Sequence, residues 1–324
     1  MLKKNNIVIL TGPTGVGKTN ISIRIAKYIP EIEIISADSM QIYKDLNIGT
    51  DKPDISILKK YPHHCIDIVS PIKNYDVMQY FNYSHKCIKN ILSRNKKPLI
   101  VGGTGLYLKS FIEPIFDGPG KNTNIRANLT KIAADKGNNF LYDELKKIDA
   151  EYSAKISKND IKRIIRGLEV YYLTGHKLSY FHHKSKDNVY QNKPNYNFYI
   201  ICLFMKREKM YQKINERVEE MIKKGLIDET KNIINKYKKE NINFKQCTAM
   251  QGLGYKQLLL HLRGYISLNE AIETIKKETR HFSKRQLSWF RNQISVDYWI
   301  NIDEYKNLEE CSKKIINIIK SMGY

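Results

Sequence analysis

The sequence is short of acidic residues, with 33 Asp and Glu against 55 Lys and Arg and a formal net charge of +22 over 324 residues. An excess of this size argues against an ordinary metabolic enzyme that acts on a small neutral substrate. It predicts a polyanionic partner, first a nucleic acid and second an anionic membrane surface. The alternative is a lysine-rich proteome, which would account for part of the excess because Asn and Ile are abundant as well.

The sequence also lacks the patterns of zinc-binding, disulfide-bonded and membrane-spanning proteins. No pair of cysteines has CxxC spacing, so neither a zinc site nor a disulfide framework is indicated. No apolar run approaches the roughly 18 residues of a membrane span, and the run Ile7–Leu10 is too short for a signal peptide. We therefore expect a cytoplasmic, monomeric protein without a membrane partner. The five cysteines are Cys65, Cys87, Cys202, Cys247 and Cys311.

Short β-branched runs alternate with helical patterns over much of the chain. Four runs read as buried strands, and the first is followed by isoleucines at helical spacing up to Pro30. Strands that alternate with helices predict an α/β fold with a doubly wound parallel sheet flanked by helices. The predicted strands are Ile7–Leu10, Ile32–Ser36, Pro98–Val101 and Tyr199–Phe204.

This alternation stops in one interval. From Asp117 to Pro194 the apolar residues follow helical spacing only, and the interval opens with the breaker string DGPGKN. The sequence therefore predicts a core domain of residues 1–117 and 197–324 that carries a helical insertion domain, residues 118–196.

A phosphate-binding loop follows the first predicted strand. Its glycines let backbone N–H groups turn toward one anion, and the following helix adds the positive end of its dipole. Lys18 supplies a charge, and the Thr19 hydroxyl is a candidate ligand for Mg²⁺. The loop predicts a diphosphate or triphosphate ligand on a P-loop NTPase-like sheet, without identifying ATP. It comprises Gly12, Pro13, Thr14, Gly15, Val16, Gly17, Lys18 and Thr19.

Two further strand ends carry polar chemistry. Asp38 follows the second strand, and its carboxylate could coordinate Mg²⁺ through water, act as a general base, or cap a helix. Gly102, Gly103 and Thr104 follow the third strand and allow close approach to a ligand. Ligands of open α/β sheets bind at the carboxyl ends of the strands, so these residues are expected to share one site with the loop. A candidate for a Walker-B-like acid is Asp67, but no catalytic glutamate or water-positioning residue stands beside it, which argues against NTP hydrolysis.

Basic residues cluster at several positions. The segment Lys276–Arg291 has six Lys and Arg against one Glu, with Phe282, Trp289 and Phe290 among them. Basic residues with aromatics suit an RNA backbone and its unstacked bases, although a helix that buries its aromatics would show the same pattern. Lys162–Arg166 and Gln251–Lys256 are further candidates, and Arg217 is either a surface residue or a ligand of a diphosphate.

Taken together, these strings resemble one family, the tRNA dimethylallyltransferases or tRNA isopentenyltransferases. The match runs in family order over nearly the whole chain, and its departures include Asp45 and Asp51, where the family often has Gly and Ala. The strings are GPTGVGKT at Gly12–Thr19, ISADSMQIYKDLNIGTDKP at Ile35–Pro53, VGGTGLYL at Val101–Leu108, DIKRIIRGLEVY at Asp160–Tyr171, MQGLGYKQ at Met250–Gln257 and KRQLSWFR at Lys284–Arg291.

The resemblance implies transfer of a dimethylallyl group from its diphosphate to the exocyclic amine of the adenosine 3′ of a tRNA anticodon. It implies that Asp38 is the general base, that Thr104 assists at the leaving group, that Arg217 holds the diphosphate and that Mg²⁺ is the cofactor. The anticodon stem-loop of tRNA would be the partner. The residues implied to contact it are Asp38, Ser39, Met40, Gln41, Arg126, Lys162, Arg163, Ile164, Ile165, Arg166, Gln251, Gly252, Leu253, Gly254, Tyr255 and Lys256.

Three rival functions share parts of this pattern. A small-molecule kinase would use the same loop for ATP but would not need the positive charge. An RNA-binding module with a nucleotide switch would bind tRNA without alkylating it. Alkylation of free AMP or ADP would not require the basic segments, which therefore weigh against this function. The donor, the acceptor and the need for ATP distinguish these functions from one another.

Overall fold

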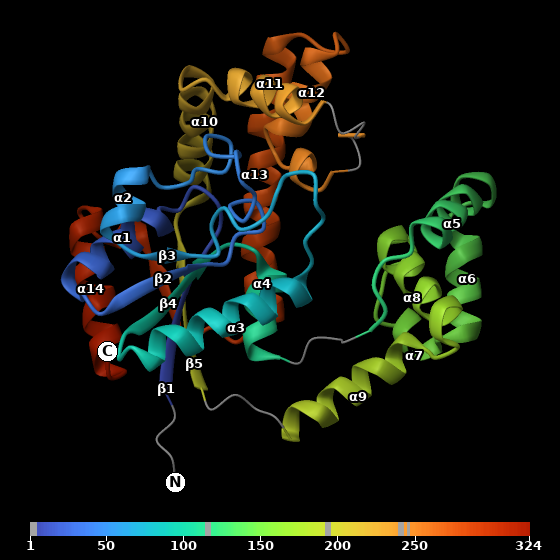
Figure 1. Cartoon of the computed structure of the whole chain (residues 1–324), viewed down its shortest axis with the longest axis horizontal. Helices are drawn as coiled ribbons and strands as arrows, with labels where there is room; N and C mark the ends of the chain where they lie inside the picture. Colours follow the sequence, from blue (N-terminus) through green and yellow to red (C-terminus); the bar gives the residue numbers. More distant parts are fainter. Residues whose placement is uncertain (1–4, 114–117, 192–195, 239–242, 245–246) are drawn as a thin grey trace. The chain divides into compact units, whose positions relative to one another are not determined.

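The computed structural model describes residues 5–113, 118–191, 196–238, 243–244 and 247–324. The chain divides into two compact units (Figure 1). The core unit combines Met1–Ile112 with Asn195–Tyr324, and the helical unit is Glu113–Pro194. For comparison, the sequence predicts an insertion of residues 118–196.

The core unit contains one parallel sheet, as the sequence predicts. Its strands are β1 (Asn5–Thr11), β2 (Ile32–Ser36), β3 (His63–His64), β4 (Lys97–Gly102), β5 (Tyr196–Phe204) and β6 (Tyr298–Asn301). Their order is β3-β2-β4-β1-β5-β6, with every pairing parallel. From β1 the chain moves to one side of the sheet, and from β4 it moves to the other. The carboxyl ends of β1 and β4 therefore form the switch point at which such sheets bind ligands.

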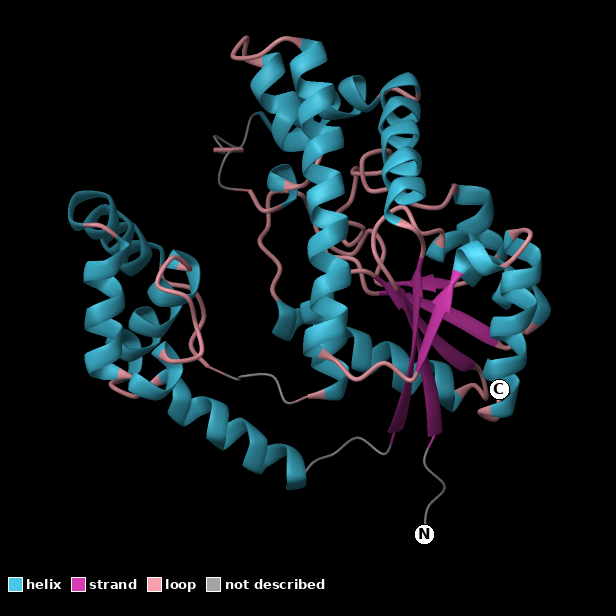
Figure 2. Ribbon diagram, turned by 180° about the vertical axis from the view of Figure 1, so that it is seen from behind, coloured by secondary structure: helices cyan, strands magenta, loops and turns pink. Residues whose placement is uncertain are grey.

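Helices cover both faces of the sheet (Figure 2). Alternating strand residues divide between the faces, so that Ile7 and Ile9 lie in one core cluster and Val8 and Leu10 in the other. One face packs against α1 (Lys18–Tyr28) and α14 (Leu308–Ser321). The other packs against α3 (Val77–Ser93), α4 (Gly105–Ile112), α11 (Leu226–Tyr237), α12 (Tyr255–Leu262) and α13 (Leu268–Gln293).

Helix α10 (Arg207–Lys223) serves both cores, with Met210 and Ile214 in one cluster and Val218 and Met221 in the other. Helix α13 begins at a capping box in which Ser267 and Glu270 bond each other's backbone N–H groups, and it packs against α10, α12 and α4. Within the described part of the core unit, further short elements are α2 (Ile55–Lys60) and the 3₁₀ turns Ala249–Gln251 and Ile302–Glu304.

The described residues of the helical unit form helices α5 (Thr123–Lys136), α6 (Asn138–Ile148), α7 (Ala150–Ser153), α8 (Ile161–Thr174) and α9 (Leu178–Gln191). The apolar stripes that predict these helices line the unit's own core, which includes Leu129, Leu141, Leu145 and Leu168. Ile164 and Ile165 belong to the same core, with 0% and 8% of their surface exposed. The prediction that the side chains of Ile164 and Ile165 contact RNA is therefore wrong, because both are buried. No described helix of either unit is both long and apolar enough to cross a membrane.

Candidate active site

The phosphate loop connects β1 to α1 in the core unit. Gly12, Gly15 and Gly17 have φ of 146°, 82° and 95°, a backbone region that favours glycine. At Gly12 a Cβ atom would also lie 2.5 Å from Leu203 O. The Lys18 ammonium donates to Gly12 O at 2.8 Å and to Pro13 O at 2.9 Å. The lysine therefore folds back over the loop that it belongs to.

Burial lowers the pKa of Lys18 to about 8, and the positive charge of Arg217 acts in the same direction, whereas Asp38 opposes it. A buried cation with incomplete charge compensation favours an incoming anion. The loop is thus electrostatically prepared for phosphate.

The loop opens into a cavity of about 800 Å³. Lys18 and Thr19 of the loop line it, and so do two predicted site residues from outside the loop, Asp38 and Arg217. Arg217 lies on α10 and donates from Nη1 to Thr14 Oγ1 at 3.0 Å. Its Nε lies 3.6 Å from Asp51 Oδ2, and Asp51 also lines the cavity.

Asp38 stands directly after β2, and no helix begins there. Its Oδ1 accepts from Met40 N at 2.8 Å, which closes a local turn. The helix-cap alternative is therefore wrong. Among the described residues, Oδ2 has no hydrogen-bond partner. The carboxylate thus keeps one oxygen for a proton or for a metal-bound water.

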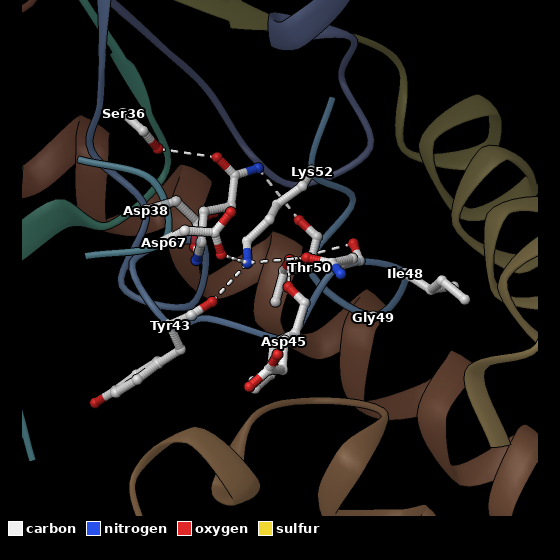
Figure 3. Close-up of polar contacts among 12 residues, drawn as sticks. Ser36, Asp38, Tyr43, Asp45, Ile48, Gly49, Thr50, Lys52 and Asp67 are labelled. Atoms are coloured by element: carbon white, nitrogen blue, oxygen red, sulfur yellow. Dashed lines mark hydrogen bonds and ion pairs between the residues drawn. The ribbon is translucent and has the colours of Figure 1, made fainter. Parts of the chain in front are cut away.

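The segment after Asp38 is fixed by polar contacts (Figure 3). The Ser36 hydroxyl donates to Gln41 Oε1 at 2.9 Å, and the Gln41 amide donates to Thr50 O at 3.2 Å. The Lys52 ammonium, whose side chain is 3% exposed, donates to Tyr43 O and to Asp67 Oδ1, each at 2.5 Å. The Walker-B-like candidate Asp67 therefore binds a lysine, and it is absent from the cavity lining.

The strand end of β4 borders a second, smaller cavity of about 230 Å³. Thr104 lines this cavity, and its Oγ1 accepts from Ser39 N at 2.9 Å. Neighbouring residues divide between the two cavities, since Asp38 and Gly102 line the larger and Ser39 and Gly103 line the smaller. The two cavities therefore lie beside the same two strand ends. The role of Thr104 at the leaving group stays a prediction.

Gln286 on α13 is a site residue that sequence reasoning missed. Its Oε1 accepts from Thr14 N at 2.8 Å, and its Nε2 donates to Gly103 O at 2.8 Å. The side chain thus joins the phosphate loop to the end of β4. One feature of the sequence could have identified it. Gln286 lies one helical turn after Ser283, so two polar residues occupy a buried face of the helix.

The other residues of the basic segment on α13 differ in how far they are buried. Phe290 is fully buried, Trp289 packs where a Cβ on Gly105 would clash with its ring, and Phe282 is 37% exposed. Lys284, Arg285 and Arg291 are exposed, whereas Arg280 donates to Asn215 Oδ1 at 2.6 Å. The helix therefore buries one aromatic in the core and presents several cations to solvent.

In the segment Gln251–Lys256, Gln251 and Lys256 are exposed, whereas Gly252, Gly254 and Tyr255 are buried. Gly252 lies against Met40, since an added Cβ would fall 2.3 Å from the methionine Cε. Tyr255 is 0% exposed and its hydroxyl donates to Glu229. A direct RNA contact by the Tyr255 side chain is therefore excluded in this conformation.

The arginines of the helical unit are largely engaged. Glu169 is 0% exposed and accepts from Arg126 at 2.7 and 2.8 Å and from Arg166 at 2.7 Å. Burial alone would raise the pKa of Glu169, but these arginines lower it to about 2. Arg163 pairs with Asp160 at 3.3 Å, and Lys162 is exposed. Arg126 and Arg166 therefore have structural partners within their own unit.

The larger cavity contains oxygen atoms that could bind a metal ion. Thr19, Asp38 and Asp51 line the larger cavity together, and hydroxyl and carboxylate oxygens are the ligands that Mg²⁺ prefers. Within the described ranges, no group of three or more His, Cys, Asp or Glu side chains is arranged to hold a metal by itself. The residues fit a Mg²⁺ that is bound jointly with phosphate oxygens.

The sequence matches known proteins over almost its full length. The IPP transferase family model matches residues 41–293. A tRNA dimethylallyltransferase of Carboxydothermus hydrogenoformans is 44% identical over 311 residues, 96% of each chain. One of Acetivibrio thermocellus is 41% identical over 321 residues, which cover 98% of this chain and 99% of the relative.

Solved structures give the same result. The full-length tRNA isopentenylpyrophosphate transferase of Bacillus halodurans has a TM-score of 0.69 and 35% identity, with 98% of this chain and 97% of that chain covered. A eukaryotic dimethylallyltransferase, described in crystallographic snapshots of its action on tRNA, has a TM-score of 0.76 and 28% identity. That match covers 96% of this chain and 78% of the eukaryotic one.

Proposed function

Because the chain belongs to the IPP transferase family, we propose that it transfers a dimethylallyl group from dimethylallyl diphosphate to the exocyclic amine of the adenosine 3′ of the anticodon in tRNA. Diphosphate is the leaving group. The observation that carries this proposal is the placement of a carboxylate, Asp38, on the cavity that the phosphate loop and Arg217 also line.

The larger cavity is the proposed donor site. Departure of diphosphate develops negative charge on the leaving oxygens, and preformed cations and N–H groups at that position lower the barrier. Lys18 and Arg217 supply the cations, and the loop between Gly15 and Thr19 supplies N–H groups. In this arrangement Lys18 exchanges its bonds to Gly12 O and Pro13 O for bonds to phosphate.

Asp38 is the proposed general base. An adenine amine is a weak nucleophile, and removal of its proton as the new C–N bond forms is worth about 10²–10⁴ in rate. The turn that binds Oδ1 to Met40 N fixes the carboxylate, and Oδ2 accepts the proton. The same atoms argue against a role limited to structure, since one oxygen suffices for the turn.

The smaller cavity is the proposed approach for the adenine. Trp289, Phe282 and Leu106 give it an apolar wall, and the cavity reaches Ser39, the neighbour of Asp38. Aromatic walls suit a base that has left its stack, at a cost of a few kcal/mol for a loop nucleotide. Contacts of phosphates with the exposed Lys284, Arg285 and Arg291 offset that cost.

Mg²⁺ is the proposed cofactor, with Thr19 Oγ1 and the Asp51 carboxylate as its protein ligands, since Asp38 is assigned to the adenine amine. It would neutralise charge on the leaving diphosphate. We also propose a cytoplasmic monomer, because tRNA is the substrate and the core unit builds both cavities from its own residues.

The test is incubation of labelled dimethylallyl diphosphate with tRNA that lacks the modification. We expect label in tRNA when Mg²⁺ is present and ATP is absent, and isopentenyladenosine after digestion to nucleosides. Label that enters free AMP, or that requires ATP, would replace the proposal with alkylation of a free nucleotide or with a kinase reaction. Binding of tRNA without any label transfer would indicate an RNA-binding module.

A further inference from the structure

We infer that Gln286 is a positioning residue that holds the phosphate loop to helix α13 and couples donor binding to RNA binding on that helix. The inference rests on the proposed function of this site. It extends that function by assigning a role to a side chain that lies between the donor site and the proposed RNA-binding surface.

The Gln286 side chain bridges two backbone segments. The amide oxygen accepts from Thr14 N and the amide nitrogen donates to Gly103 O, both at 2.8 Å. The oxygen therefore acts as an acceptor and the nitrogen as a donor, as their chemistry requires. The residue is 8% exposed, so little of the side chain is open to water. A Cβ on Gly103 would lie 2.6 Å from Nε2, so the close approach requires glycine at that position.

The bond to Thr14 determines which loop groups can face the anion. The Thr14 N–H is directed to Gln286 and is therefore not available to phosphate. The Thr14 hydroxyl is bonded to Arg217 on α10. Thr14 is thus held by two helices, and these bonds set the direction of the N–H groups that follow it in the loop.

Helix α13, which carries Gln286, also carries exposed basic residues. The neighbours of Gln286 in the sequence, Lys284 and Arg285, are exposed, and Arg285 lines the smaller cavity beside Gln286. A polyanion bound to these cations restrains α13. Because Gln286 connects α13 to the loop through Thr14 N and to the end of β4 through Gly103 O, the restraint favours one loop conformation. Linkage then requires that RNA tighten the binding of the diphosphate and that diphosphate tighten the binding of RNA.

The test measures binding and does not need the chemical step. Inorganic diphosphate is titrated with Mg²⁺ present, without tRNA and at saturating tRNA, into wild type, Gln286→Met and Gln257→Met. Gln257 is the matched control. It is a 4% exposed glutamine of helix α12, not of α13, and its side chain accepts one backbone N–H, from Gly254 at 3.0 Å.

We expect Gln286→Met to weaken diphosphate binding roughly tenfold, as for the loss of one net hydrogen bond, and to abolish the effect of tRNA on it. In prenyl transfer, KM for the donor should rise more than kcat falls. Gln257→Met should retain both the affinity and the tRNA effect. Equal diphosphate affinity and an equal tRNA effect in Gln286→Met and wild type would overturn the inference.

Two further arms separate the possible failures. Gln286→Glu keeps the volume and the acceptor for Thr14 but loses the donor to Gly103 O, so diphosphate binding should weaken and recover relative to wild type as the pH is lowered and the carboxyl regains a proton. A residue that only fills space would show no such recovery, and its absence would count against the inference. If wild type transfers no dimethylallyl group but shows the coupling, the proposed function fails and the role of Gln286 stands.

Discussion

The hydroxyl of Tyr255 donates to Glu229 Oε1 at 2.6 Å, which joins helix α12 to helix α11. The same carboxylate accepts backbone N–H groups from three consecutive residues, Asn47 at 2.9 Å, Ile48 at 2.8 Å and Gly49 at 3.2 Å. Gly49 packs so closely on the Tyr255 ring that a Cβ would lie 2.6 Å from it. Tyr255 and Glu229 thus anchor the loop that brings Asp51 to Arg217.

We predict that Glu229→Gln lowers the free energy of unfolding by about 1.5–3 kcal/mol, because an amide offers one acceptor where the carboxylate makes charge-assisted bonds with four donors. Displacement of the loop should also raise KM for the donor. Chemical denaturation and donor kinetics measure both effects. The control is Glu219→Gln, which removes an exposed pair with Lys276 and should cost about 1 kcal/mol or less. An equal effect of the two substitutions would contradict the anchoring role.

We predict that Asp38→Asn lowers turnover by about 10²–10⁴ and leaves donor and tRNA affinity nearly unchanged. The asparagine oxygen can still accept from Met40 N, so the turn is kept while the base is lost. Single-turnover transfer and tRNA binding measure the two effects separately. Asp45→Asn is the control, since Asp45 pairs with Lys236 at 2.8 Å and is not part of the cavity lining. Unchanged turnover in Asp38→Asn would remove Asp38 from the role of base.

We predict that donor affinity falls as the pH is raised through about 8. Burial lowers the pKa of Lys18 to about 8. The side chain is therefore positively charged below that pH, and above it loses this charge and the attraction of the charge for diphosphate. The kcat/KM for the donor should fall above pH 8, whereas kcat should fall at higher pH because bound diphosphate stabilises the ammonium. Lys18→Arg should remove the decline at pH 8, because a guanidinium stays protonated. A donor affinity that is constant from about pH 7 to about pH 9.5 would contradict the assignment.

Much of the sheet could be predicted because its central strands are continuous β-branched runs that end in glycine or in small polar residues. The predicted strand Ile32–Ser36 coincides with β2, and the other three predicted strands lie within β1, β4 and β5. The edge strands were not predicted. His63–His64 is only two residues long, and Tyr298–Asn301 exposes Tyr298 and Trp299, so neither has a buried pattern. Their strand character comes from pairing with β2 and β5.

The candidate site was predictable where the chemistry is local. The glycines, Lys18 and Asp38 could be assigned because a strand end places them at the switch point. Gln286 and Glu229 could not, because their roles depend on partners more than a hundred residues away in the sequence. Tyr255, Ile164 and Ile165 were assigned to RNA from the strings that contain them, and the structure buries them.

We predict that Lys162 and Arg166 respond differently to alanine substitution, although the same string contains both. Lys162 is exposed, so Lys162→Ala should weaken tRNA binding without loss of stability and lower the slope of log affinity against log salt by about one. Arg166 bonds the buried Glu169 and also Pro119 O at 2.7 Å. Its removal leaves Glu169 with one fewer partner and should lower the free energy of unfolding by about 1.5–3 kcal/mol.

Salt titrations of tRNA affinity and chemical denaturation of each variant distinguish the two roles. Lys155→Ala is the control, because Lys155 is an exposed lysine of the same helical unit that already pairs with Glu151 at 2.7 Å, and its salt slope and stability should stay close to those of wild type. An unchanged salt slope in Lys162→Ala would remove Lys162 from the RNA contact. Unchanged stability in Arg166→Ala would show that Arg126 alone satisfies Glu169 and would contradict the structural role of Arg166.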